Sequence, residues 1–224
     1  MPLCLSMHRN WRGRFESRQF FELLCADQTG RLIIVKKVLL MLALLFICLP
    51  KADACVGKTL YIGVIDSAEG QVLSEILSTI INERTGTTVK TRYYKNTQDL
   101  YEAVSMKQVD MLIENTTRAM KIIDKPADSD LQRTYETVKS MYEKNRGLIW
   151  FKPFGFLNGG GGQSYTAPVL KVEVLNNFPA LPRVVGKLAG TISDETYARL
   201  IKSVESGEKA KKVAKDFLKS RKLI

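Results

Sequence analysis

The sequence predicts an α/β domain in which helices flank a mostly parallel sheet. Short apolar runs with strand character alternate with segments whose apolar residues recur at helical spacing. The connections are short and polar, and such alternation favours parallel strands joined by right-handed crossovers. The chain has 224 residues, of which 45% are hydrophobic, and this is enough for one good-sized domain.

The expected elements of the first half alternate strictly. They are, in order, a strand at 60–65, a helix at 70–86 that ends at a glycine, a strand at 89–93, a helix capped by Asn96 and Thr97, and a strand at 109–113. A longer helical region then follows, which Pro126 interrupts and Ser129 restarts, and which ends at Gly147. Residues 148–151 return as a strand.

Residues 157–164 are predicted to be a glycine-rich linker, because Gly159 to Gly162 have no side chains to pack. Residues 55–156 precede it as the first part of the domain, and residues 165–224 follow it as a mainly helical segment. That segment opens with a short extended piece at 167–170 and closes with a helix whose apolar face includes Val213 and Phe217.

Residues 1–54 are predicted to lie outside the folded domain. The longest apolar run, at 38–49, follows two lysines and precedes an Ala-Asp-Ala triplet. This order is typical of a secretory signal peptide, here assigned to residues 35–54, and the run is shorter than the about 20 residues that cross a membrane. Residues 1–34 are interpreted as a mis-assigned start or a disordered extension.

Cys55 stands directly after this triplet, so two processing reactions compete. Either Cys55 becomes a lipid-bearing first residue, or a peptidase leaves it as a free thiol. It is the only cysteine after the predicted cleavage, so a mature monomer forms no disulfide. The protein is expected in the periplasm or on the outer face of the cell envelope, with a lipid anchor in the first case.

Predicted cleavage leaves a basic chain. The first 54 residues hold eight Lys/Arg and four Asp/Glu, so residues 55–224 hold 26 and 19 and carry a charge of +7. Much of this charge lies in the last predicted helix, at Lys209, Lys211, Lys212, Lys215, Lys219, Arg221 and Lys222. Acidic residues are interspersed, which favours a solvated helix face over a nucleic-acid surface, so no nucleic-acid partner is predicted.

The residue types argue against catalysis. The only histidine, His8, lies in the predicted leader, so the mature chain has no imidazole base and no histidine metal ligand. The sequence contains no phosphate-binding glycine-lysine loop, no G-x-G-x-x-G motif and no G-x-S-x-G elbow. We therefore predict a binding protein without metal or cofactor rather than an enzyme.

Three polar loops follow predicted strands and should meet at one edge of the sheet. Each opens a helix, whose free N–H groups favour an anionic ligand group, although each residue taken singly also fits a helix cap. Tyrosines near strand ends could face a quaternary ammonium group, but core packing is the alternative, favoured for Tyr93 and Trp150. The candidate ligand-binding residues are Asp66, Ser67, Glu69, Tyr94, Asn96, Thr97, Glu114, Asn115, Thr116 and Tyr165.

The order of segments resembles the substrate-binding components of ABC transporters for glycine betaine, carnitine, choline and related osmoprotectants. Residues 58–156, with the strand Asp110-Met-Leu-Ile-Glu114 and the exit segment Gly147-Leu-Ile-Trp-Phe-Lys-Pro-Phe-Gly-Phe156, are similar to the first lobe of that family. Residues 165–195 and the helix at 211–218 are similar to its returning C-terminal segment. The resemblance implies a single lobe of the type II periplasmic-binding-protein fold, with the C-terminal helices packing back on the sheet.

Two departures from the family accompany the resemblance. The family's chain enters a second lobe where this sequence has its glycine run. The stretch from Glu114 to Ala119 resembles a Glu-Tyr-Thr-Gly-Thr-Ala pattern, but Asn115 replaces the tyrosine and Thr117 replaces the glycine. The resemblance implies an exported protein that delivers a small quaternary-ammonium or zwitterionic osmoprotectant to a membrane permease. Because the second lobe is missing, our hypothesis adds a homodimer in which a second copy supplies the absent wall. The alternative is a one-lobed envelope interaction or sensory module that has lost solute capture.

Overall fold

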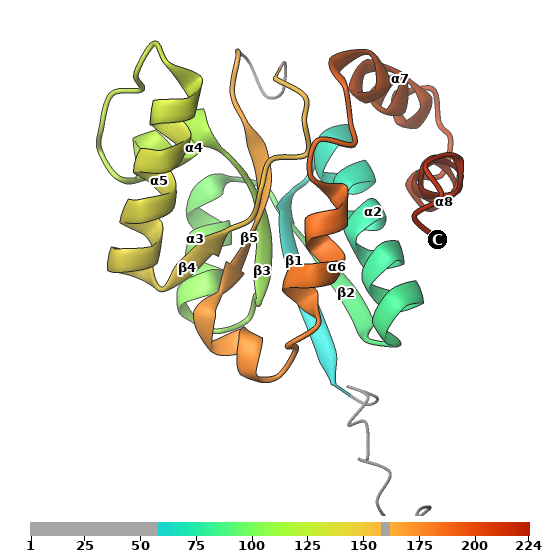
Figure 1. Ribbon diagram of the computed structural model, residues 1–224, viewed down its shortest axis with the longest axis horizontal. Coiled ribbons are helices and arrows are strands. Elements are labelled where there is room, and N and C mark those ends of the chain that lie inside the picture. The colour runs from blue at the N-terminus through green and yellow to red at the C-terminus, as the bar shows by residue number, and fades with distance from the viewer. Residues whose placement is uncertain (1–57, 158–161) are drawn as a thin grey trace, which may run out of the picture. The chain divides into compact units, whose positions relative to one another are not determined.

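Five strands form one sheet in the order β2-β1-β3-β5-β4, with helices on both faces (Figure 1). Strands β1 (Thr59–Ile65), β2 (Thr88–Tyr94) and β3 (Met111–Asn115) pair in parallel. Strand β5 (Thr166–Lys171) lies antiparallel between β3 and β4 (Leu148–Trp150). The predicted α/β class with a mostly parallel sheet is confirmed.

The computed structural model describes residues 58–157 and 162–224, and these residues form one compact unit. The predictions for residues 1–34, for the signal peptide at 35–54 and for Cys55 lie outside the described residues, as does most of the glycine run. Within the described ranges, no helix is long and apolar enough to span a membrane.

One face of the sheet is covered by α3 (Thr97–Ser105), α4 (Thr116–Ile122) and α5 (Leu131–Arg146). The opposite face is covered by α2 (Ala68–Thr85), α6 (Leu181–Val185), α7 (Asp194–Glu205) and α8 (Ala210–Ser220), with short 3-10 turns at Val172–Asn176 and Gly186–Leu188. Each layer buries its own apolar cluster against the strands. The C-terminal segment therefore returns to the side of the sheet that carries α2, and α7 and α8 pack against α2.

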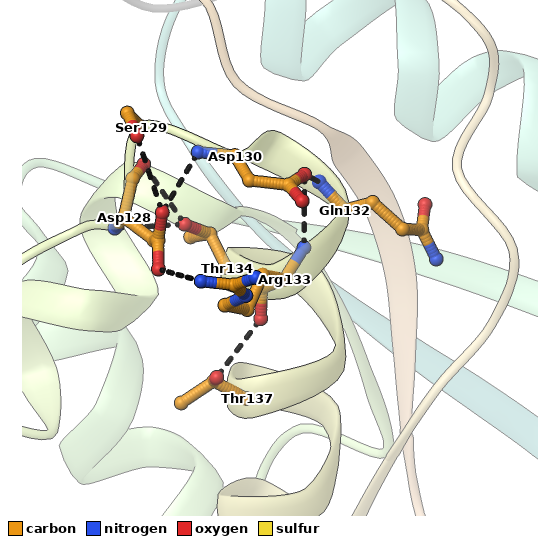
Figure 2. Close-up of polar contacts among 7 residues, drawn as sticks. All are labelled: Asp128, Ser129, Asp130, Gln132, Arg133, Thr134 and Thr137. Atoms are coloured by element: carbon orange, nitrogen blue, oxygen red, sulfur yellow. Dashed lines mark hydrogen bonds and ion pairs between the residues drawn. The ribbon is translucent and has the colours of Figure 1, made fainter.

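Helix ends follow local residue chemistry. Gly86 and Gly147 adopt the left-handed conformation that terminates α2 and α5, as their positions predicted. Figure 2 shows the start of α5, where the Asp130 carboxylate accepts hydrogen bonds from the backbone N–H groups of Gln132 and Arg133. The predicted restart at Ser129 is wrong by one residue, because the Ser129 hydroxyl donates to Asp128 rather than capping the helix.

Strand β5 has a larger role than the short extended piece predicted at 167–170. It is an internal strand even though Pro168 has no N–H to donate to β4. The opposite residue, Phe151, donates its N–H to the Pro168 carbonyl over 2.9 Å, and the Phe151 carbonyl accepts the Tyr135 hydroxyl over 2.9 Å instead. A side chain from α5 thus replaces the hydrogen bond that proline cannot make.

Two sequence predictions about individual strands need correction. Strand β3 begins at Met111 rather than at 109 and extends to Asn115. Tyr93, expected in the core, is 45% exposed, because it lies near the end of the edge strand β2.

The exit segment of β4 and the return from β5 are tied together. The N–H of Ser164 donates to the Leu157 carbonyl over 2.8 Å, so the chain leaves and re-enters at adjacent points. Ile192 N–H donates to the Phe154 carbonyl over 3.0 Å, which pins the exit segment to the start of the C-terminal helices. Gly155 allows this approach, since a Cβ there would lie 2.8 Å from the Gly190 Cα.

Candidate functional site

The predicted strand tips meet at one edge of the sheet, which lies at the top of Figure 1 between α4 and α7. The N–H of Asp66, just after β1, donates to the Tyr94 carbonyl at the end of β2 over 2.9 Å. At the end of β3, Thr116 N–H donates to the Tyr165 carbonyl over 2.9 Å, and Tyr165 N–H donates to the Thr116 hydroxyl over 3.1 Å. The edge therefore joins residues from four strands.

Three of the candidate residues cap the helices that they open. Ser67 Oγ accepts the Gly70 N–H over 3.0 Å, and Asn96 Oδ1 accepts the Asp99 N–H over 2.9 Å. Asn115 Oδ1 accepts the N–H of residue 118 over 2.7 Å. These side-chain oxygens satisfy helix donors, so the capping interpretation holds for all three.

The candidate residues with aromatic rings or hydroxyl groups are half-buried or buried. Tyr94 and Tyr165 are half-buried and pack against the cluster on the α3–α5 side, where Tyr165 meets Tyr135 edge-on with ring centroids 5.9 Å apart. Thr97 is half-buried and Thr116 is buried. Beside them, at the start of β5, the buried Thr166 hydroxyl has no hydrogen-bond partner among the described residues.

Glu114 lies at the centre of a buried polar network under the edge. Its side chain is fully buried, and its carboxylate forms an ion pair with the Arg118 guanidinium. It also accepts the Asn115 N–H over 2.8 Å and the Tyr101 hydroxyl over 2.7 Å. Tyr101 and Tyr142 share a hydrogen bond of 2.6 Å between their hydroxyl oxygens.

Burial sets the electrostatics of this network. It raises the pKa of Glu114 above its ordinary value, although the Arg118 charge and the donated hydrogen bonds act in the opposite direction. Burial together with the Glu114 charge also raises the pKa of Tyr101 and of Tyr142. Both tyrosines therefore remain neutral hydrogen-bond donors near pH 7.

The network reaches across the edge to Glu69 in the first turn of α2. Burial raises the pKa of the Glu69 carboxyl, while the nearby Arg118 charge and a hydrogen bond from Tyr197 lower it. Tyr197 lies on α7 and stacks on Phe156, with ring centroids 4.0 Å apart. The Arg118 charge thus acts on two carboxyl groups, those of Glu69 and Glu114.

A close approach of backbone fixes the α2 side of the edge. A Cβ on Gly70 would lie 2.1 Å from the Ile65 carbonyl oxygen, so the first turn of α2 sits directly on the end of β1. Asp66 remains exposed here and accepts a hydrogen bond from the Gln71 amide over 3.3 Å. Only a glycine permits this geometry, and it sets the height of Glu69 above the sheet.

Sequence reasoning missed the partners that hold the two glutamates. Tyr101, Tyr142 and Tyr197 lie on helix faces where core packing explains an aromatic residue equally well. The one available signal was Arg118, which stands four residues after Glu114 at the spacing of a helical ion pair.

Other features do not enter the candidate site. A shallow hollow lined by Glu136, Lys139, Ser140, Glu143 and Lys144 lies on the outer side of α5, away from the strand tips. The described residues contain no group of three or more His, Cys, Asp or Glu side chains that could hold a metal ion.

Residues 58–161 match the protein family described as the substrate-binding domain of the ABC-type glycine betaine transport system. No curated protein sequence matches the chain. A solved structure described as a glycine betaine/carnitine/choline ABC transporter is 13% identical, with a TM-score of 0.67 over 74% of this chain and 98% of that chain. Apo YehZ from Escherichia coli is 15% identical, with a TM-score of 0.64 over 75% of this chain and 100% of that chain.

These comparisons confirm the resemblance found in the sequence. The two solved structures share the fold of this chain. The family match covers the tips of β1, β2 and β3 and supports a solute-binding role.

Proposed function

We propose that the chain is the exported solute-binding protein of an ABC uptake system and delivers a small quaternary-ammonium or zwitterionic osmoprotectant to a membrane permease. The observation that carries this proposal is the gathering of four strand tips at one edge, where the tips of β1, β2 and β3 belong to the segment that matches a glycine betaine substrate-binding family. In open α/β sheets, ligands bind outside the carboxyl ends of the strands where the crossover direction reverses.

The candidate edge has the chemistry for a cationic head group. Glu69 supplies a half-buried carboxylate, and the half-buried rings of Tyr197 and Tyr165 supply aromatic surface at the same edge. Aromatic faces attract an ammonium group by about 0.5–2 kcal/mol per ring. A zwitterion would in addition place its carboxylate near Arg118, whose side chain is 27% exposed.

Calorimetric titration of residues 55–224 with glycine betaine, choline, carnitine and proline tests the proposal. We expect saturable heat with at least one of them. Glu69→Gln should weaken binding of a cationic solute by about tenfold or more, because a nearby carboxylate contributes at least ~1.4 kcal/mol to a cation. Glu136→Gln, on the outer face of α5, serves as the matched control and should leave binding unchanged. Absence of heat for all four solutes at millimolar concentration contradicts the proposal.

Export and partners complete the proposal. Residues 35–54 would direct export, and Cys55 would begin the mature chain with or without a lipid. Because a single sheet leaves the strand tips open on one side, a second copy would cover a bound solute as a homodimer. Light scattering with and without solute measures this: the proposal expects a solute-dependent increase in mass, and an unchanged monomer at saturating solute removes the dimer from it.

A second function is favoured by one observation. The exit and return segments are hydrogen-bonded at Leu157 and Ser164, so the described fold has one lobe, and Arg118 lies over the buried carboxylate at its edge. Such a lobe could serve as an envelope interaction or sensory module without solute capture. Recovery of a signalling protein or a cell-wall component from envelope extracts, in place of a permease, would favour this function.

A further inference from the structure

The charge of the mature chain is concentrated on one helix. Residues 209–222 hold seven Lys/Arg and one Asp, whereas residues 55–208 hold 19 Lys/Arg and 18 Asp/Glu and are nearly neutral. On α8, Lys211, Lys215 and Lys219 recur every four residues and are exposed. The opposite face of α8 is buried, and it contributes four residues to the apolar cluster: Val213, Ala214, Phe217 and Leu218.

The lysine stripe opposes the stability of its own helix. Like charges four residues apart destabilise a helix by about 0.2–0.5 kcal/mol per pair, and cations in the first turn oppose the helix dipole. Lys209, the residue that precedes α8, provides no side-chain cap, and the first turn of α8 has no acidic residue. The neighbouring α7 has a Ser193 cap followed by Asp194 and Glu195. The arrangement of α8 is therefore not explained by helix formation.

Only two of the cations at 209–222, Lys212 and Arg221, have side-chain partners among the described residues. Within the described residues, the only ion pair on this helix joins Lys212 to Glu208 over 3.1 Å. Arg221 donates to the Thr196 hydroxyl over 3.3 Å and lies over the Phe217 ring. The charges of Lys211, Lys215, Lys219 and Lys222 face solvent.

We propose that a lysine stripe, made of Lys211, Lys215 and Lys219 on the exposed face of α8 together with Lys222 in the turn that follows, docks on an anionic lipid bilayer. Clusters of four or more basic residues on a helix bind anionic membrane surfaces, and each cation adds to the attraction. From Lys211 to Lys219 the stripe runs about 12 Å along the helix, which suits a row of headgroups. The proposal rests on the export that the proposed function assumes, because only an exported chain meets the outer surface of the membrane.

The composition of the face separates a bilayer from other polyanions and from a protein partner. Protein interface cores are enriched in aromatic residues and depleted in lysine, and the exposed large apolar residues of the described chain, Tyr93, Met106 and Val172, all lie outside α8. Nucleic-acid recognition uses arginine forks and interleaved aromatic residues, which this face lacks. Flexible lysines without apolar neighbours fit a diffuse surface that they adsorb to without insertion.

In Figure 1, α8 lies on the outer side of α2, and the strand tips point to the top of the view. Contact through the lysine stripe therefore leaves the candidate edge uncovered. A lobe held against the bilayer in this way keeps its solute edge accessible.

Vesicle co-sedimentation tests the docking. Residues 55–224 contain both apolar clusters of the described fold, and they omit the apolar run that would bind any membrane. We expect binding to phosphatidylcholine vesicles that contain about one part in three phosphatidylglycerol, no binding to phosphatidylcholine alone, and loss of binding as salt rises from about 0.05 M to about 0.5 M.

Two variants that remove the same number of lysines distinguish an effect of the lysine stripe from an effect of net charge. Replacing Lys211, Lys215, Lys219 and Lys222 with Gln should lower partitioning by about tenfold or more, and Gln retains a similar helix propensity. The control replaces four exposed lysines elsewhere with Gln, at Lys90, Lys121, Lys144 and Lys187, and should lose far less. Equal losses in both variants, absent vesicle binding at low salt, or tighter binding to duplex DNA than to vesicles would each overturn the proposal. Solute titration of the stripe variant is independent, so a failure here leaves the proposed function standing.

Discussion

The tips of β2 and β3 lie on the same edge but are built differently. At the tip of β2, Asn96 is exposed and its side chain caps the helix that follows it. At the tip of β3, Glu114 is fully buried and contacts Arg118 on α4 and Tyr101 on α3. The β2 tip therefore stabilises only the helix that follows it, whereas the β3 tip links several elements.

The difference shows where function can reside in this lobe. An exposed cap can change with little effect beyond its own helix, because its hydrogen bonds have water as an alternative. A buried carboxylate has no such alternative, so its partners must be present together. The β3 tip is therefore the part of the edge where sequence changes most strongly affect both stability and the shape offered to a solute.

The largest difference in stability between the two tips is expected when the partner of the buried Glu114 carboxylate is removed. Arg118→Ala should lower the free energy of unfolding by about 3 kcal/mol, near the lower end for a broken buried pair because Arg118 is 27% exposed and water can partly replace it. Urea denaturation measures the change. Arg118→Lys keeps the charge and should lose less, while a loss below about 1 kcal/mol for Arg118→Ala would show that the network is not a buried unit.

A smaller effect is expected at the β2 tip. Asn96→Ala removes the acceptor of the Asp99 N–H and should lower the free energy of unfolding by about 1 kcal/mol. Gln98→Ala, at an exposed position in the same turn, is the control and should change stability little. A loss at Asn96 as large as that at Arg118 would erase the distinction between the two tips.

The smallest effect is on the pH dependence rather than on the level of stability. Because burial raises the pKa of Glu114, the folded chain holds this proton more tightly than the unfolded chain does. The resulting stabilisation is complete below the ordinary value of 4.5 and is lost as pH rises through the raised value.

Glu114→Gln has no such titration, so the stability of the native chain relative to this variant should fall across that window. Thermal melts at a series of pH values measure it. The exposed Glu136→Gln should give a flat difference, and a native chain that gains stability over Glu114→Gln with rising pH would contradict the raised pKa.

The sequence predicted the strand and helix order because apolar periodicity and caps act locally. Residues 60–65, Ser67 with its helix, and Asn96 with its helix all needed only neighbouring residues to be recognised. The meeting of the strand tips at one edge could also be predicted, because parallel strands end on the same side of a sheet. What could not be predicted depends on contacts between distant segments.

Two examples show this limit. Pro168 argues against an internal strand unless the Tyr135 hydroxyl, from another element, is known to supply the missing hydrogen bond. Glu114 fitted a polar loop at a strand end, but its burial against Tyr101 and Tyr142 depends on how α3 and α5 lie on the sheet. In both cases a tertiary contact reverses what the local residue type favours.

The hydrogen bond between Leu157 and Ser164 holds these two residues close together, so sequence can be inserted between them without separating the strands. Chain ends that are already adjacent accept added sequence at low entropic cost, since each doubling of loop length adds only about 0.6 kcal/mol. A lineage could gain or shed a whole domain here in one genetic event while the sheet remains intact. The same turn would accept a fluorescent reporter in a biosensor.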